Sequence, residues 1–138
     1  MIIGITGKYC AGKDHVAGIL KEMGFSEIDL DKIGHEELNL RREAVFKRFG
    51  ARLRREDSSV DRKGLGEIVF SDPKALQELE SLLHPGMKRR TAEILGDSPD
   101  KNWIINAAIL KTLGLHPLCD FILWISAPML IRFCRSVK

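Results

Sequence analysis

The alternation of apolar and polar residues along the chain predicts strands that are separated by helices. Four strand-like runs lie at residues 1–6, 25–31, 103–110 and 119–126. The first run leads into a segment, 12–24, whose apolar residues recur at helical spacing until Gly24. The last two runs are almost wholly apolar, which is typical of parallel strands that are buried on both faces. We therefore expect an α/β fold with a parallel sheet.

The segment between the second and third runs, residues 32–95, has a mostly helical pattern. Two turn signals interrupt it, "SDP" at Ser71–Pro73 and "HPG" at His84–Gly86, and we expect the helices to break at both. The pattern therefore predicts a helical insertion, residues 32–95, beside the sheet of a single domain, residues 1–138.

The pattern stops inside a helix that would follow the fourth run, in the segment "APMLIRFCRSVK". A sheet that ended there would leave the apolar run 119–126 near an open edge, and such edges promote association. The hypothesis is that further chain, with another strand and more helices, belongs to the complete protein.

Composition narrows the class of protein without identifying it. The chain has 138 residues, of which 44% are hydrophobic and 30% charged, as is usual for a soluble globular domain. Its three cysteines show no metal-ligand spacing, and it has no apolar run of membrane length and no recognisable targeting segment. A net charge of +3 is too small to indicate nucleic-acid binding. We expect a cytoplasmic protein with no nucleic-acid or membrane partner and an oligomeric state that the sequence leaves open.

The stretch "GKYCAGKD" has the spacing G-x-x-x-x-G-K of a phosphate-binding loop, and it lies between a predicted strand and a predicted helix. Glycines let backbone N–H groups surround phosphate oxygens, and the start of the helix adds partial positive charge. Lys13 would reach the β- and γ-phosphates of a nucleotide such as ATP. The alternative is a glycine-rich turn that only joins strand to helix. The expected nucleotide-binding residues are Gly7, Lys8, Tyr9, Cys10, Ala11, Gly12, Lys13, Asp14 and His15.

Asp14 stands where this motif usually has Ser or Thr, whose hydroxyl binds Mg²⁺. A carboxylate is also a hard oxygen ligand for Mg²⁺, but it repels a phosphate charge by about 4 kcal/mol at ~4 Å and an effective dielectric of ~20. A bound Mg²⁺ attracts both groups, so Asp14 should make nucleotide binding more dependent on the metal. Alternatively, Asp14 is a plain acid in the first turn of the helix. The next residue, His15, could donate to an α-phosphate or point to solvent.

Asp29 and Asp31 end the second run, "FSEIDLD". In a strand, the period of two places both acids on one face, at the carboxyl end beside the phosphate loop. A carboxylate there can orient an attacking hydroxyl, accept its proton or hold Mg²⁺ through water. We prefer Asp31 as the catalytic acid and a metal ligand, and Asp29 as a substrate-binding residue. Either acid could instead cap the helix that starts near Lys32.

Three segments of the chain match the pattern of one kinase family. "IGITGKYCAGKD" is similar to the family's "LTGGIGSGKST", and "IDLDKIGHEEL" to its "IDADxIxHxL". The segment "FGARLRREDSSVDRKGLGEIVFSDPKALQELESLLHP" follows "FGxxIL…DGxIDRxxLxxxVFxDxxxLxxLExIxHP" almost position by position. With these segments, which span residues 3–85, the chain resembles the dephospho-coenzyme A kinase family, P-loop kinases of the nucleoside-monophosphate-kinase type.

The resemblance implies a three-layer P-loop fold and the last step of coenzyme A biosynthesis. In that step the γ-phosphoryl group of ATP passes to the ribose 3′-hydroxyl of dephospho-CoA, with Mg²⁺. Asp31 matches the family's catalytic acid, and the helical insertion matches the region that receives the CoA moiety. Within that region, Arg62 could pair with the acceptor's pyrophosphate, or with Asp61 or Glu67 instead. His84 could bind the acceptor, or it could cap or pack at the helix break.

The chain also departs from the family pattern. The family's "PLL" and the acid that follows it are here "AIL", residues 108–110, and Lys111. The regularly spaced arginines that lead into the family's lid are offset here, at Arg132 and Arg135. The sequence ends shortly after them, and we therefore expect this 138-residue chain to lack the lid and the last strand. Because lid arginines stabilise the charge of the transferred phosphoryl group, turnover should suffer unless these two arginines substitute in part.

Two other interpretations remain open. Phosphomevalonate kinases also have loops of the form G-x-x-x-x-G-K-D, so the acceptor could be another small molecule, as in a mevalonate-pathway or a nucleotide kinase. The stretch "SVDRKGLGEIVFSDP" argues against this. The other interpretation is a nucleotide-binding module that has no turnover. It is compatible with the acid at position 14, the missing acid after Leu110 and the missing lid.

Overall fold

The computed structural model describes residues 1–8 and 11–127. In chain order its strands and α-helices are β1 (Ile2–Gly7), α1 (Lys13–Glu22), β2 (Ser26–Asp29), α2 (Leu30–Leu40), α3 (Arg42–Phe49), α4 (Arg62–Phe70), α5 (Pro73–Asp97), β3 (Trp103–Asn106) and β4 (Phe121–Ile125). Short 3₁₀ turns lie at Ala51–Leu53 and His116–Leu118. Strands thus alternate with helices, and a helical segment separates β2 from β3, as the sequence pattern predicted.

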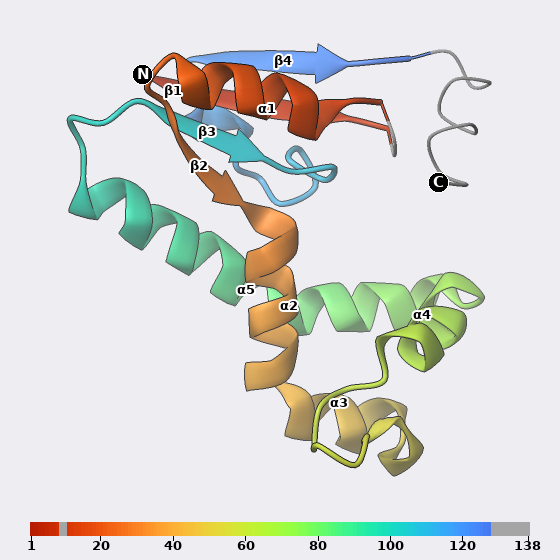
Figure 1. Cartoon of the computed structure of the whole chain (residues 1–138). Coiled ribbons are helices and arrows are strands. Elements are labelled where there is room, and N and C mark those ends of the chain that lie inside the picture. The colour runs from red at the N-terminus through yellow and green to blue at the C-terminus, as the bar shows by residue number, and fades with distance from the viewer. Residues whose placement is uncertain (9–10, 128–138) are drawn as a thin grey trace. The chain divides into compact units, whose positions relative to one another are not determined.

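All four strands are parallel and lie in the order β2-β3-β1-β4 (Figure 1). In the register of the sheet, Asn106 lies opposite both Ile5 and Asp29, and Gly7 lies opposite Ile125. The carboxyl ends of the strands therefore share one edge of the sheet, from which the phosphate loop leaves β1. In parallel α/β sheets this edge is where ligands bind. The predicted α/β fold with a parallel sheet is confirmed.

The two faces of the sheet are covered by different segments. On one face, Ile3 and Ile5 of β1 pack with Ile104 of β3 and Ala17 of α1, and all four side chains are buried. On the other face, the segment 107–120 approaches β1 so closely that a methyl group at Gly4 would meet Leu110 and Cys119. Cys119 has a free thiol, and its pKa is raised by burial and by the nearby Asp120.

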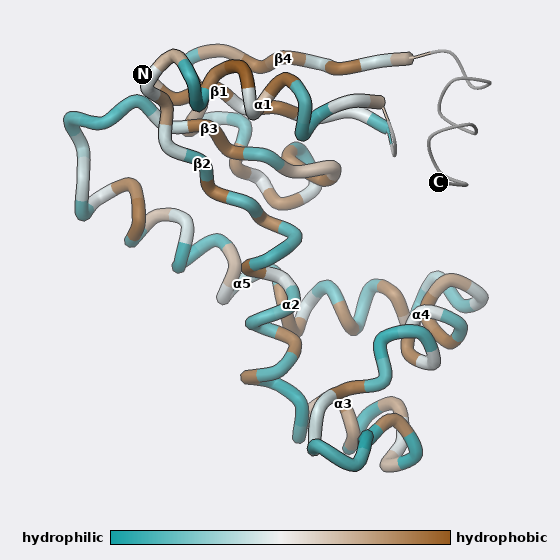
Figure 2. The backbone as a smooth tube through the Cα atoms, in the orientation of Figure 1, coloured by the Kyte–Doolittle hydropathy of each residue, from teal (hydrophilic) through white to brown (hydrophobic). Residues whose placement is uncertain are grey.

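β4 forms one edge of the sheet and is exposed along most of its length. Phe121, Ile122, Leu123 and Trp124 are 59%, 48%, 37% and 64% exposed, and Figure 2 shows the apolar character of this strand. Successive residues of a strand point to opposite faces. Both faces of β4 are therefore apolar and partly exposed in the described part of the chain, in agreement with the open apolar edge expected from the sequence.

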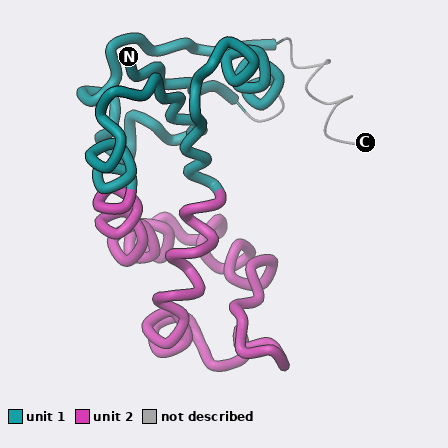
Figure 3. The backbone as a smooth tube through the Cα atoms, turned by 60° about the vertical axis from the view of Figure 1, so that its left-hand side comes forward, with its two compact units in different colours: residues 1–31, 91–138 teal, residues 32–90 magenta. Residues whose placement is uncertain are grey.

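The chain divides into two compact units (Figure 3). The first consists of residues 1–31 and 91–138 and contains the sheet and α1, and the second consists of residues 32–90. The second unit has a core of its own, formed by apolar side chains of its helices, which include Leu38, Val45, Phe46, Leu65 and Val69. A separate core explains how the helical segment forms a unit of its own.

One of the two predicted helix breaks differs from the observed structure. α4 ends before Ser71–Asp72 as expected, but the predicted break at "HPG" is wrong, because Pro85 lies inside α5. Pro85 removes one backbone hydrogen bond, and the helix persists because Leu79, Leu82 and Leu83 pack against the core of the second unit. Although α5 is 25 residues long, no helix among the described residues is both long and apolar enough to cross a bilayer.

Candidate functional site

The phosphate loop joins β1 to α1 within the first unit, as its spacing predicted. Gly12 is the N-cap of α1 and has a φ of 105°, a left-handed conformation that favours glycine. Its carbonyl accepts from the N–H of Val16 at 3.2 Å, and the N–H of Ala11 donates to the carbonyl of Lys8 at 3.1 Å. The described residues of the loop thus lead into a helix N-terminus, where partial positive charge favours an anion. The predicted binding residues Tyr9 and Cys10 lie outside the described residues.

Lys13, the first residue of α1, turns its side chain back over the loop. Its Nζ donates to the carbonyl oxygens of Gly7 and Lys8, at 3.2 Å each. A lysine ammonium has three donor protons, so one remains for a phosphate oxygen. The two carbonyls hold the charge above the loop, where a nucleotide's phosphates would lie.

Gly7 ends β1 at a position that excludes any side chain. It is buried, its φ is 154°, and a methyl group there would overlap the backbone carbonyl of Ile125 in β4. The glycine therefore serves two purposes, since it starts the loop and lets β4 approach β1 at the carboxyl edge.

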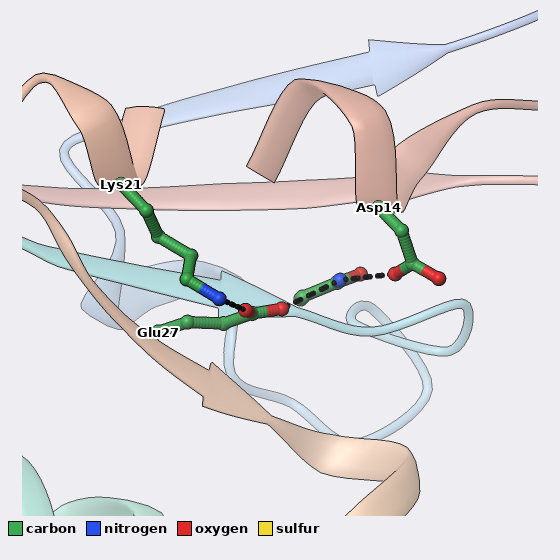
Figure 4. A network of polar contacts seen from close by, with 4 residues as sticks. Asp14, Lys21 and Glu27 are labelled. Atoms are coloured by element: carbon green, nitrogen blue, oxygen red, sulfur yellow. Dashed lines mark hydrogen bonds and ion pairs between the residues drawn. The ribbon is translucent and has the colours of Figure 1, made fainter. Parts of the chain in front are cut away.

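Asp14 is exposed in the first turn of α1, but it is not a plain surface acid. Its Oδ1 accepts a hydrogen bond of 3.0 Å from Nδ2 of Asn106, the last residue of β3. The same amide nitrogen donates to Oε1 of Glu27 in β2 at 3.0 Å. Figure 4 shows Asp14 and Lys21 projecting from α1 towards this group, and Lys21 forms an ion pair of 3.0 Å with Glu27. Asp14 is thus directed to the carboxyl edge of the sheet.

Sequence reasoning missed Asn106 and Glu27. Asn106 is 5% exposed, and Glu27 is half-buried. The available signal was a single polar residue inside "WIINAAIL", an otherwise apolar strand, because a buried polar side chain needs a partner. His15 follows Asp14 and is exposed, and its predicted contact with an α-phosphate stays a prediction.

The prediction that Asp29 and Asp31 share one face of a strand is wrong. β2 ends at Asp29, and Asp31 lies in the first turn of α2. Oδ1 of Asp29 accepts a hydrogen bond of 3.0 Å from the backbone N–H of Asp31, as expected of an N-cap residue. Asp29 therefore has the capping position that the sequence left as an alternative, and Asp31 follows it, exposed, at the carboxyl edge of the sheet.

The predicted acceptor-binding residues belong to the second unit. Arg62 is exposed at the start of α4, and its Nη1 lies 2.9 Å from Nδ1 of His35 in α2. Asp61 caps α4 by accepting from the N–H of Gly64 at 3.2 Å. His84 is half-buried in the middle of α5, so the alternative that it caps a helix break is wrong.

The departures from the family pattern fall in two places. The segment 108–110 forms a turn in which Leu110 is buried, and Oγ1 of Thr6 donates to the carbonyl of Ala108 at 3.2 Å. Lys111, which replaces the family's acid, is exposed. Arg132 and Arg135 lie outside the described residues.

The described side chains can supply part of a Mg²⁺ site. Among the described residues, no three His, Cys, Asp or Glu side chains form a group that could hold a metal ion. Mg²⁺, however, is commonly held by one or two carboxylates together with the phosphates of a nucleotide. Asp14 can supply such a carboxylate oxygen next to the loop, because only its Oδ1 takes part in the bond to Asn106.

Comparison with known proteins identifies the family. The family model for dephospho-CoA kinase matches residues 1–138. The chain belongs to the dephospho-CoA kinase family. A dephospho-CoA kinase of Borreliella burgdorferi is 38% identical over 128 residues, which are 92% of this chain and 62% of the relative. One of Moorella thermoacetica is 33% identical over 141 residues, 97% of this chain and 66% of the relative.

Solved structures agree with this assignment of fold. A crystal structure from Thermus thermophilus has a TM-score of 0.86 at 29% identity and covers 99% of this chain, which spans 71% of that structure. The fold of a dephospho-CoA kinase from Campylobacter jejuni is also similar, with a TM-score of 0.68 at 21% identity over 99% of this chain and 94% of that one. The chain spans less than two thirds of the length of the curated relatives named above. The resemblance to the family, which the sequence predicted, is confirmed.

Proposed function

We propose that this chain transfers the γ-phosphoryl group of ATP to the ribose 3′-hydroxyl of dephospho-CoA. The observation that carries the proposal is the position of the Lys13 ammonium, held over the phosphate loop by the carbonyls of Gly7 and Lys8. This cation lies at the carboxyl edge of the sheet, the edge that Asp31 also adjoins. Membership of the dephospho-CoA kinase family supports the choice of donor and acceptor.

The proposed roles follow from charge and position. The loop amides and Lys13 bind the β- and γ-phosphates and stabilise the negative charge of the transferred group. Asp31 accepts the proton of the acceptor hydroxyl while that oxygen attacks the γ-phosphorus, and ADP leaves. A bound Mg²⁺ would supply positive charge that neutralises part of the charge of the phosphates. Asp14 and Asp31 are the side chains that we assign to the metal, and Asp29 fixes the start of the helix that carries Asp31.

The acceptor's anionic groups are assigned to the second unit. Arg62 is exposed, so its guanidinium can pair with a pyrophosphate in place of its contact with His35. His84 matches a motif position of the family and is the other proposed contact. We place the reaction in the cytoplasm, where the free thiol of Cys119 would persist.

A coupled assay of ADP release tests this function. The chain is incubated with Mg·ATP alone, with dephospho-CoA, and with other small-molecule acceptors such as phosphomevalonate or a nucleoside monophosphate. Release that depends on dephospho-CoA, together with a product that carries one additional phosphate, supports the proposal. Release with another acceptor favours a different kinase, and ATP binding without release favours a nucleotide-binding module.

A further inference from the structure

Asn106 occupies a particular position in the first unit, at the end of β3 between two acids from other elements. Its side chain is 5% exposed, and its Nδ2 lies 3.0 Å from both Oδ1 of Asp14 and Oε1 of Glu27. Only the amide nitrogen can face two carboxylate oxygens, because the amide oxygen would be repelled by both. The orientation of this amide is therefore determined by its surroundings.

The two acids that accept hydrogen bonds from Asn106 differ in their other contacts and in their position. Glu27 is also neutralised by Lys21 of α1, at 3.0 Å, so this bond belongs to a structural connection between β2, β3 and α1 (Figure 4). Asp14 directly follows the phosphate-binding Lys13, at the position where the motif usually has a hydroxyl that binds Mg²⁺. Of the two hydrogen bonds that Asn106 donates, only the bond to Asp14 reaches a residue of the proposed nucleotide site.

An acid at position 14 needs such a partner more than a hydroxyl would. A short carboxylate on an exposed first turn can adopt several rotamers, and only those that turn towards the sheet edge bring an oxygen to the metal of a bound nucleotide. The bond from Asn106 selects one of them by engaging Oδ1, and this leaves Oδ2 available as a ligand. Residues that orient a metal ligand in this way commonly contribute 10–100-fold to metal affinity.

We propose that Asn106 is a positioning residue, which holds the Asp14 carboxylate in the orientation that binds the Mg²⁺ of Mg·ATP. The inference rests on the proposed function only in requiring that the loop bind Mg·ATP, and it does not involve the acceptor. Asp14 and Asn106 then act as a pair. With Ser at position 14, the amide at position 106 loses this role.

A double-mutant cycle tests the pair. The dissociation constant of ADP is measured by calorimetry with Mg²⁺ and with EDTA, for wild type, Asp14→Ser, Asn106→Ala and the double variant. We expect Asn106→Ala to reduce the Mg²⁺-dependent gain in affinity about tenfold when Asp14 is present, and less than about twofold in the Asp14→Ser background. An equal loss in both backgrounds overturns the proposal, because the effect would then not pass through Asp14.

The other acid held by the same amide provides the matched control. Glu27→Gln keeps an acceptor for Asn106 and leaves the bond to Asp14 intact, and Lys21→Met removes only the ion pair with Glu27. Both variants should change the Mg²⁺-dependent gain less than about twofold, although they reduce stability. A loss in Glu27→Gln as large as that in Asn106→Ala would show that Asn106 has only a structural role, and it would overturn the proposal.

A second measurement needs no change at the buried position. The side-chain amide protons of Asn106 are followed by NMR during titration with Mg²⁺ in the presence of ADP. We expect a shift in wild type that is lost in Asp14→Ser, and no shift in wild type contradicts the proposal. Because neither experiment contains dephospho-CoA, a chain that shows the coupling but no acceptor-dependent turnover would refute the proposed function alone. Turnover without coupling would refute this inference alone.

Discussion

The carboxylate of Asp29 accepts a hydrogen bond of 3.0 Å from the backbone N–H of Asp31, so the first acid of the pair starts the helix that carries the second. This contact assigns the two acids different tasks, although they are only two residues apart. Asp29 fixes the helix start, and Asp31 is exposed at the edge of the sheet where the phosphate loop begins.

Asp31→Asn should therefore abolish most of the turnover. The amide cannot accept the proton of the acceptor hydroxyl, and the loss of a general base usually lowers the rate by about 100-fold or more. The affinity for Mg·ATP should change much less than kcat. Steady-state kinetics with dephospho-CoA, together with calorimetry of ADP binding, separates the two effects. An unchanged kcat would remove Asp31 from the chemistry.

Asp29→Asn is the control for this variant, because asparagine is an equally good N-cap residue and keeps the helix start. We expect turnover near the wild-type value and little change in stability. Asp29→Ala should lower the free energy of unfolding by about 1 kcal/mol, since the N–H of Asp31 loses its acceptor.

Asp14→Ser should make nucleotide binding less dependent on Mg²⁺. Without the metal, the wild-type carboxylate repels the phosphates by up to about 4 kcal/mol at ~4 Å, and the serine hydroxyl does not. The loss of ATP affinity on adding EDTA should therefore be at least about tenfold smaller in the variant, which corresponds to about 1.4 kcal/mol. Calorimetry with and without EDTA measures it. Equal losses in the two proteins would exclude a metal-linked role for Asp14.

Local signals in the sequence were sufficient to predict the loop and the alternation of strands and helices, but not the positions of the two acids at the end of β2 and the start of α2. Ile28 and Leu30 continue the period-two pattern of a strand, and Leu30 is in fact buried, although in a helix. The capping bond of Asp29 ends the strand earlier than the pattern suggests. Nor could the pattern predict that Asn106 meets Asp14, because the pair is 92 residues apart and depends on sheet register.

Gly7 and Gly18 should respond to alanine in opposite ways. At Gly7, the positive φ and the overlap with the carbonyl of Ile125 should cost at least about 2 kcal/mol and disturb the loop. At Gly18, inside α1, a methyl group meets nothing within 4 Å, so Gly18→Ala should stabilise the protein by about 0.5–1 kcal/mol. Urea unfolding of both variants measures this contrast, and similar stability of the two would contradict the packing of β4 against Gly7.

Gly86 and Gly96 form a second such pair, both in α5. A methyl group at Gly86 would overlap Oε2 of Glu37, a carboxylate that is 2% exposed and lies 3.8 Å from Arg41 Nε and from Arg90 Nη1. Displacing a buried charge from its cations is costly, so Gly86→Ala should lower stability by about 3 kcal/mol. Gly96→Ala, with open space around it, should raise it by about 0.5–1 kcal/mol.

A rescue experiment isolates the cause of the Gly86→Ala defect. Glu37→Ala alone removes the buried carboxylate and its ion pair of 3.8 Å with Nη1 of Arg90, a buried nitrogen with no hydrogen-bond partner among the described residues, so it should destabilise as well. If the steric overlap is responsible, Gly86→Ala should cost less than about 1 kcal/mol in the Glu37→Ala background, because the overlapping atom is gone. Additive losses in urea unfolding would place the defect of Gly86→Ala elsewhere.

The exposed edge strand β4 should make the 138-residue chain associate at high concentration. Four successive apolar side chains, with neither a charge nor a proline among them, lie on an edge whose backbone groups can pair with another strand. Trp124→Lys places a charge on this edge and should keep the chain monomeric at concentrations where wild type forms larger species. The change in stability should stay within about 0.5 kcal/mol, because Trp124 is 64% exposed. Leu40→Lys is the matched control, since Leu40 is 72% exposed and belongs to α2 rather than to the sheet. Sedimentation velocity over a concentration series distinguishes the two variants, and suppression of association by Leu40→Lys to the same degree would mean that general surface charge, rather than the β4 edge, controls it.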